Sequence, residues 1–205
     1  LHTILYRLQT EGVSGLKPGD RVLACVEYGA YAEKLLALAD QCHPMPDEIS
    51  FEKAAAMGLV YLTAYFALRD RAVLKQRESV FVIGAKGGIG MASIQVAKAL
   101  GAGVVIAGVR DAENAEFVEE MGADHVLDLS MEGLRDNLRK KVYSLTNGQG
   151  VDVVIDPVGG FASAAALRAL AWKGRLVVIG FASGVIPEIK TNYLLVKNIT
   201  VTGLQ

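Results

Sequence analysis

From about residue 78 onward the chain alternates short runs rich in Val and Ile with helical segments, and this alternation constrains the fold more than any other feature. Continuous apolar strands separated by helices are typical of a parallel sheet that is covered on both faces. The runs predicted to be strands are 80–83, 104–107, 125–127, 151–155, 175–179 and 199–202. Six strands with five crossovers predict an α/β fold with the open, doubly wound Rossmann sheet that binds dinucleotides.

Composition limits the classes of protein that the chain can belong to. Of its 205 residues, 52% are hydrophobic and 21% are charged, with a net charge of -1, so a large core is expected. A balance this close to neutral indicates neither a nucleic-acid partner nor an anionic membrane, and no apolar run is long enough to span a bilayer. The two cysteines, Cys25 and Cys42, form no CxxC pair, which fits a reducing compartment and predicts a cytoplasmic location.

The first fifty residues have a different character, with several turn signals and two runs predicted to be strands, 21–26 and 29–35. A turn at 16–20 precedes the apolar run at 21–26, and Ser50 is placed to cap a helix. That helix is expected to break or bend near Gly58. The predicted domains are therefore 1–50 and 51–205.

The segment GAKGGIG joins the first strand of the alternating region to its first helix. Aligned with the dinucleotide fingerprint, Ala85 takes the place of the first glycine, while Gly87 and Gly90 take the second and third. Gly87 would let the backbone approach a pyrophosphate, and the free N–H groups of the helix would face that anion. Ala85 is compatible with this turn if its φ is negative. A tight turn without a ligand is the structural alternative, and S-adenosylmethionine is the alternative ligand.

The end of the second strand discriminates between NAD and NADP. An acidic residue there bonds the ribose 2′-OH of NAD, whereas an arginine can hold a 2′-phosphate. Val109 takes the usual place of the acid and Arg110 follows it, which favours NADP. Asp111 is the competing acid, and its alternative role is to cap the next helix. The alternative for Arg110 is a solvated charge in the loop that binds no phosphate. For Lys86 two interpretations are open: it approaches a phosphate, or it faces solvent.

A series of motifs occurs in one order and spacing between Val13 and Gly203: GLKPGDRV, GAYAE, LTAY, AKGGIG, AKALGA, GADHVLD, GVDVVIDPVGG, GRLVVIGFASG and NYLLVKNITVTG. In these motifs the chain resembles the medium-chain dehydrogenase/reductase superfamily, and within it the zinc-free quinone oxidoreductase branch, which is ζ-crystallin-like. The resemblance implies a Rossmann domain beside a GroES-like catalytic β domain, of which the N-terminal residues would be a part. It also implies that NADPH gives hydride to a quinone or to an α,β-unsaturated carbonyl.

The resemblance also implies roles for single residues. Thr63 would lie near the nicotinamide, Gly180 and Phe181 would lie beside it, and the glycine loop would hold the pyrophosphate. The cofactor-binding residues predicted from the motifs and the resemblance together are Thr63, Ala85, Gly87, Gly88, Ile89, Gly90, Val109, Arg110, Gly180 and Phe181. Two departures from the family pattern, Asn114 in place of a Lys and Leu129 in place of a Tyr, place more of the 2′-phosphate binding on Arg110. No catalytic residue is assigned.

Zinc is not expected. The zinc-dependent relatives supply a Cys shortly before Thr63, where this chain has Leu59, and Cys25 and Cys42 lie at no ligand spacing. A substrate carbonyl would then be polarised by hydrogen bonds. The segment 156–160 ends a strand at the ligand edge, where it either borders the adenosine pocket or only turns the chain.

The resemblance also has consequences for the whole molecule. Most of the GroES-like domain would precede residue 12, so we expect a truncated form in which the catalytic cleft is incomplete. An NADPH-binding protein without turnover is therefore the alternative to an oxidoreductase. The apolar strand Ile199–Thr202 is expected at the sheet edge, where it predicts a homodimer.

Overall fold

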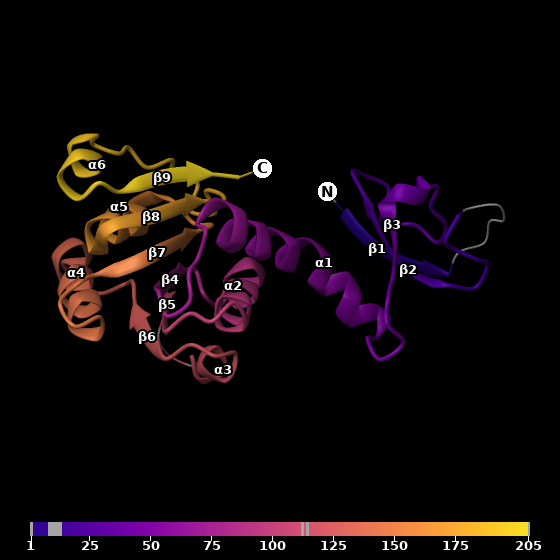
Figure 1. Cartoon of the computed structure of the whole chain (residues 1–205), viewed down its shortest axis with the longest axis horizontal. Coiled ribbons are helices and arrows are strands. Elements are labelled where there is room, and N and C mark those ends of the chain that lie inside the picture. Colours follow the sequence, from indigo (N-terminus) through magenta and orange to yellow (C-terminus); the bar gives the residue numbers. More distant parts are fainter. Residues whose placement is uncertain (1, 8–13, 112, 114, 205) are drawn as a thin grey trace. The chain divides into compact units, whose positions relative to one another are not determined.

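The structure is a computed structural model that describes residues 2–7, 14–111, 113 and 115–204 (Figure 1). The chain forms two compact units, Leu1–Leu62 and Thr63–Gln205. Helix α1 (Phe51–Phe66) begins in the first unit and ends in the second. The domain limits expected from the sequence, 1–50 and 51–205, stay a prediction.

The first unit contains an antiparallel sheet of three strands with β2 in the middle. Its strands are β1 (His2–Arg7), β2 (Arg21–Val26) and β3 (Cys42–Pro44), and a short helix, η1 (Ala39–Gln41), precedes β3. In β2 the side chains of Val22, Ala24 and Val26 are buried and alternate with less buried ones. The run at 21–26 is thus a strand, as its sequence predicts.

Helix α1 is continuous through Gly58, so it does not break there, and a bend at Gly58 stays a prediction. One glycine inside a helix costs only about 1 kcal/mol relative to alanine, which the remaining turns of a 16-residue helix outweigh. The Lys53 amide donates to Ser50 Oγ at 3.2 Å, so Ser50 caps α1 as predicted. The wider turn η2 (Ala67–Arg71) follows α1 and is of the π type.

The second unit is built on a parallel sheet of six strands in the order β6-β5-β4-β7-β8-β9. The strands are β4 (Ser79–Ile83), β5 (Val104–Val109), β6 (His125–Asp128), β7 (Val151–Asp156), β8 (Leu170–Val178) and β9 (Thr200–Gly203). This is the predicted doubly wound Rossmann sheet. The chain reverses its direction of travel across the sheet between β4 and β7, and ligands bind at such a switch point, outside the carboxyl ends of the strands.

Helices cover both faces of this sheet (Figure 1). On one face, α2 and α3 pack over Val80 and Val82 of β4, and on the other, α4 and α5 pack over Phe81 and Ile83. Alternate residues of one strand therefore enter different halves of the core, which explains why β4 is buried along its whole length. The helices are α2 (Gly88–Ala99), α3 (Glu116–Glu120), α4 (Leu134–Leu145), α5 (Gly160–Ala169) and α6 (Asn192–Lys197).

No helix within the described ranges is long and apolar enough to cross a membrane.

Candidate cofactor site

Four loops meet at the carboxyl edge of the six-stranded sheet, and they carry most of the predicted site residues. The loop after β4 is tied to β5, because the Ala85 amide donates to the Gly108 carbonyl at 3.0 Å. The loop after β7 is tied to the loop after β8, because the Gly160 amide donates to the Val185 carbonyl at 2.9 Å. Segments far apart in the sequence thus form one continuous edge.

The glycine loop makes its sharp turn at Gly84, one residue before the fingerprint begins. Gly84 has φ +68, and a Cβ there would lie 2.7 Å from Val158 Cγ2. Ala85 is buried and keeps a negative φ, the condition under which alanine is tolerated at this place. At Gly90 a Cβ would overlap the Gly84 carbonyl oxygen, so α2 can pack this closely on the loop only with glycine. The motif alignment assigned no role to Gly84, although its position directly after a strand was a usable signal.

The N-terminus of α2 presents free hydrogen-bond donors. Gly87 caps the helix with extended backbone (φ -84, ψ 163) and without a side-chain hydrogen bond. Among the described residues the amides of Gly88, Ile89 and Gly90 have no acceptor. Gly87 is exposed, and the Gly84 carbonyl oxygen, at 3.3 Å, is the sole atom that a Cβ there would approach. Three unpaired amides beside an open glycine backbone fit a pyrophosphate.

The loop after β5 offers one unpaired cation. Val109 is buried, while Arg110 is exposed and has no hydrogen-bond or ion-pair partner in the described chain. The Asp111 carboxylate accepts from the Glu113 amide at 2.8 Å, so it stabilises the loop rather than a helix. The helix expected to begin at Ala112 instead begins at Glu116, and Ala112 itself lies outside the described residues, as does Asn114.

Lys86 has a protein partner in the structure, and the alternative that it also approaches a phosphate stays a prediction. Its ammonium donates to the Glu113 carbonyl at 2.5 Å, so it connects the glycine loop with the loop after β5. Leu129, the other departure from the family pattern, is half-buried and packs in the apolar cluster beneath α4 and α5.

The loop after β8 carries Gly180 and Phe181, which lie next to the loop after β7. The Phe181 side chain is 42% exposed, and a Cβ on Gly159 would lie 2.9 Å from its ring. Gly159 has φ +72, so this turn also requires glycine. Thr63 is half-buried near the end of α1, and its place beside a nicotinamide stays a prediction.

Asp156 is a polar group at the switch point whose role was not predicted. Its side chain is 0% exposed at the end of β7. Oδ1 accepts from the amides of Val158 (3.0 Å) and Gly159 (2.8 Å), whereas Oδ2 has no hydrogen-bond partner among the described residues. A buried acceptor without a partner is costly, so Oδ2 is a point where an internal water would be held.

The described residues contain no cluster of three His, Cys, Asp or Glu side chains that could hold a metal ion. Cys25 and Cys42 are free thiols in the first unit. Burial, together with the nearby Asp40 and Cys25, raises the pKa of Cys42, which keeps this thiol protonated and a poor metal ligand. The absence of a resident metal stays a prediction.

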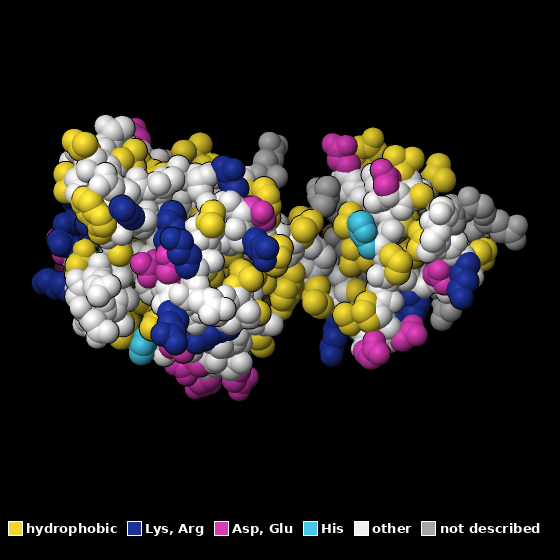
Figure 2. Space-filling model, in the orientation of Figure 1, with side chains coloured by type: hydrophobic (Ala, Val, Ile, Leu, Met, Phe, Trp, Pro, Cys, Tyr) yellow, Lys and Arg dark blue, Asp and Glu magenta, His cyan; other side chains and the backbone are white. Residues whose placement is uncertain are grey.

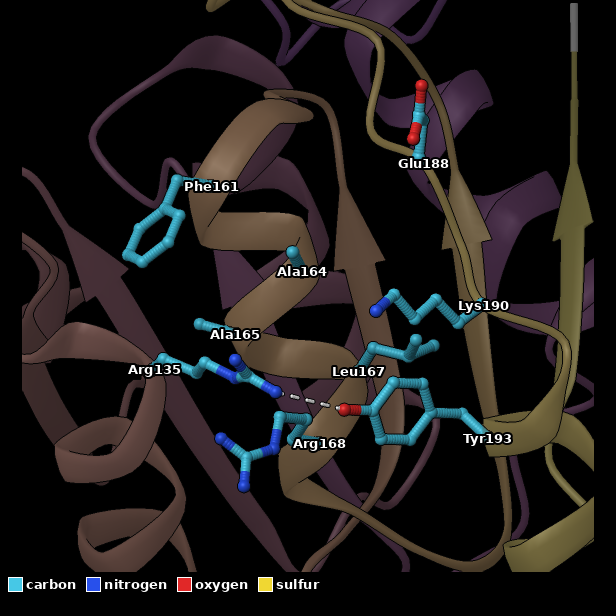
Figure 3. A pocket seen from close by; sticks show the side chains of 9 residues that line it. All are labelled: Arg135, Phe161, Ala164, Ala165, Leu167, Arg168, Glu188, Lys190 and Tyr193. Carbon is cyan, nitrogen blue, oxygen red and sulfur yellow. Dashed lines mark hydrogen bonds between the residues drawn. The ribbon is translucent and has the colours of Figure 1, made fainter.

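A pocket of about 190 Å³ lies elsewhere in the second unit, along α5 (Figure 3). Arg135 donates to Tyr193 Oη there at 3.3 Å, and the Arg168 guanidinium is paired with Asp136 at 2.6 Å. None of the predicted cofactor-binding residues lines this pocket. The pocket along α5 is therefore separate from the candidate cofactor site.

Comparison with known proteins defines the class of this fold and site. Residues 88–205 match the family model described as zinc-binding dehydrogenase. A quinone oxidoreductase-like protein 2 homolog of Nematostella vectensis is 38% identical over 194 residues, which are 94% of this chain and 52% of that protein. The chain thus belongs to the medium-chain dehydrogenase/reductase superfamily, in its quinone oxidoreductase branch.

Solved structures resemble the chain over nearly its whole length. The quinone oxidoreductase of Escherichia coli was solved in complex with NADPH, and it matches this chain with a TM-score of 0.85 at 33% identity. The matched region is 99% of this chain and 61% of the Escherichia coli chain. A probable oxidoreductase from Mycobacterium abscessus has a TM-score of 0.82 at 40% identity. The matched region is 98% of this chain and 58% of the Mycobacterium abscessus chain. The chain spans about half the length of the curated relatives that it matches.

Proposed function

We propose that this chain binds NADPH along the carboxyl edge of its six-stranded sheet, as part of an NADPH-dependent oxidoreductase that reduces a quinone or an α,β-unsaturated carbonyl. The observation that carries the proposal is the anion cradle at the start of α2, which is formed by the backbone amides of Gly88, Ile89 and Gly90. There three amides without acceptors stand beside the exposed backbone of Gly87. The complexes of two similar proteins with NADPH support the choice of cofactor.

Each loop of the edge has a distinct part in this proposal. The amides of Gly88 and Ile89 hold the pyrophosphate, and the unpaired Arg110 takes the 2′-phosphate. The loop with Gly180 and Phe181 forms one wall beside the nicotinamide. When bound, the cofactor supplies a hydride, and the protein's part is to orient it and to exclude water.

We further propose that the reaction needs no zinc. The matched region 88–205 contains no cysteine and one histidine, His125, so it offers no zinc ligand set of the usual kind. Polarisation of the substrate carbonyl would then come from hydrogen bonds. Oxidation of NADPH that is unchanged after treatment with a chelator would support this part of the proposal, and loss of activity that is restored by Zn²⁺ would contradict it.

The central test compares binding with turnover. NADPH binding is followed by fluorescence titration, and NADPH oxidation is followed with a simple quinone as acceptor. Gly87→Ala is the informative variant, because its methyl group would approach one protein atom, the Gly84 carbonyl oxygen at 3.3 Å, and stands where the pyrophosphate would approach. Gly203→Ala, in β9, is the matched control, since a Cβ there has an ordinary 3.5 Å contact with the Val178 carbonyl oxygen.

We expect Gly87→Ala to bind NADPH at least about tenfold more weakly, because its methyl group would keep the pyrophosphate from the Gly88 and Ile89 amides, and the loss of one hydrogen bond to a charged group costs about 1.5 kcal/mol or more. Gly203→Ala should bind normally. Equal affinities of the two variants for NADPH would contradict the proposal that the anion cradle binds the pyrophosphate. Binding without oxidation would favour an NADPH-binding protein without turnover. Thermal stabilisation by S-adenosylmethionine but not by NADPH would overturn the cofactor assignment.

A further inference from the structure

Lys86 connects the two loops between which the adenosine half of a dinucleotide would lie. It stands in the glycine loop, two residues after the sharp turn at Gly84. Its ammonium donates to the Glu113 carbonyl at 2.5 Å, and Glu113 lies three residues beyond Arg110. The side chain therefore ends beside the loop after β5, where a nucleotide-binding sheet of this kind reads the 2′ position of the ribose.

The charged groups around this loop leave Arg110 and Lys86 available to bind a phosphate. Asp111 is the acid nearest to Arg110 in sequence, and its carboxylate is engaged by the Glu113 amide. A lysine ammonium has three donors, and the Glu113 carbonyl takes one of those of Lys86. Acidic side chains gather over α3, which follows this loop (Figure 2), and they belong to Glu116, Glu119 and Glu120. These carboxylates repel a phosphate bound at this loop, so one arginine alone would bind it only weakly.

We propose that Lys86 is a specificity-determining residue that, together with Arg110, binds the 2′-phosphate of NADPH. This inference rests on the proposed NADPH function and names a second cation of that site. The Glu113 carbonyl holds the ammonium in place before the ligand arrives, which lowers the conformational entropy lost when the phosphate binds. The two remaining N–H groups of Lys86 then donate to phosphate oxygens.

The experiment isolates the 2′-phosphate by using small probes. Adenosine 2′,5′-bisphosphate and adenosine 5′-monophosphate differ by that phosphate alone, and their dissociation constants are measured by calorimetry together with those of NADPH and NADH. Lys86→Gln keeps a donor for the Glu113 carbonyl but removes the charge, and Lys86→Arg keeps the charge. Lys190→Gln, which removes an exposed lysine in the pocket along α5, is the matched control.

We expect Lys86→Gln to weaken binding of NADPH and of adenosine 2′,5′-bisphosphate by about tenfold or more, as for loss of one charge-assisted hydrogen bond. Binding of NADH and of adenosine 5′-monophosphate should change by less than about twofold, since neither ligand carries the charge that Lys86 neutralises. Lys86→Arg should keep the preference for the 2′-phosphate, and Lys190→Gln should behave as wild type. In the wild type the logarithm of the affinity for the bisphosphate should fall more steeply with the logarithm of the salt concentration than in Lys86→Gln.

Several outcomes would overturn the inference. Equal losses for ligands with and without the 2′-phosphate would show that Lys86 only connects the two loops, and no loss at all would remove it from the site. Both results leave the proposed function intact if the wild type prefers NADPH. A wild type that does not distinguish the two adenosine probes would instead contradict the proposed NADPH specificity itself.

Discussion

At the scale of single residues, Arg110 is the side chain whose loss should affect cofactor choice most directly. It is exposed and has no hydrogen bond or ion pair with the described residues, so its removal breaks no such interaction among them. We expect Arg110→Ala to weaken NADPH binding by about 1.5–3 kcal/mol, the range for a hydrogen bond to a charged group, and to change NADH binding little. Fluorescence titrations with both cofactors measure the difference.

Arg139→Ala provides the matched loss of charge, because Arg139 is an exposed arginine of α4 that contacts the ring of Tyr143. It should leave both affinities unchanged. Equal weakening of NADPH and NADH by Arg110→Ala would show that Arg110 holds the loop and does not read the 2′-phosphate.

At the scale of elements, Arg175 of β8 connects that strand to the segment that precedes β4. From β8 it donates to both carboxylate oxygens of Glu78, at 3.0 and 2.5 Å, and to the Ala72 carbonyl at 2.9 Å. Burial alone would raise the pKa of Glu78, but the hydrogen bonds and charge of Arg175, with a smaller effect from Lys75, hold that pKa below its usual value of 4.5. The ionised carboxylate therefore stabilises the fold above about pH 4.5, and this contribution is lost as the pH falls through the lower pKa of the folded state.

We expect Glu78→Gln to lower the free energy of unfolding at pH 7 by about 1–3 kcal/mol, because a bidentate, largely buried ion pair is lost. The difference from wild type should shrink as the pH is lowered from about 5 to about 3, since protonation removes the same charge from the wild type. Urea unfolding followed by circular dichroism checks both. Asp136→Asn, which removes an ion pair whose carboxylate is 69% exposed, should cost at most about 1 kcal/mol, and a larger effect there than at Glu78 would contradict this account.

At the scale of the whole molecule, β9 is the last strand of the six-stranded sheet, and none of the described residues pairs with its outer edge. We expect two copies to associate through this edge as a homodimer. Sedimentation velocity at micromolar concentration should show a dimer for the wild type and a shift towards monomer for Thr200→Lys, because an exposed charge on an edge strand opposes strand pairing. Thr191→Lys adds the same charge outside the strand and should leave the dimer intact. A wild type that sediments as a monomer would contradict the expectation.

The six strands of the parallel sheet were predictable because each is a run of apolar, mostly β-branched residues bounded by turn residues, and this information is local. In the first unit the strand predicted at 29–35 is wrong, since that segment forms bends and loop, and the short strands β1 and β3 were not predicted. Helix ends were less predictable. The break expected at Gly58 is absent because the cost of one glycine is small, and α3 begins at Glu116 because the Asp111 carboxylate stabilises a loop where a capped helix was expected. The glycine loop was placed correctly, but its sharp turn lies at Gly84, since backbone conformation depends on what the loop packs against.

The sequence by itself determined the α/β alternation, the glycine loop between a strand and a helix, and the absence of an acid at Val109. Each of these depends on residues that are neighbours in the chain. Only the tertiary structure decided that Lys86 contacts the Glu113 carbonyl and that Asp156 is buried with one unpaired oxygen. Both facts depend on how loops from separate strands meet at the edge of the sheet, and burial and hydrogen bonding at such a meeting point follow from packing in three dimensions, which no local pattern records.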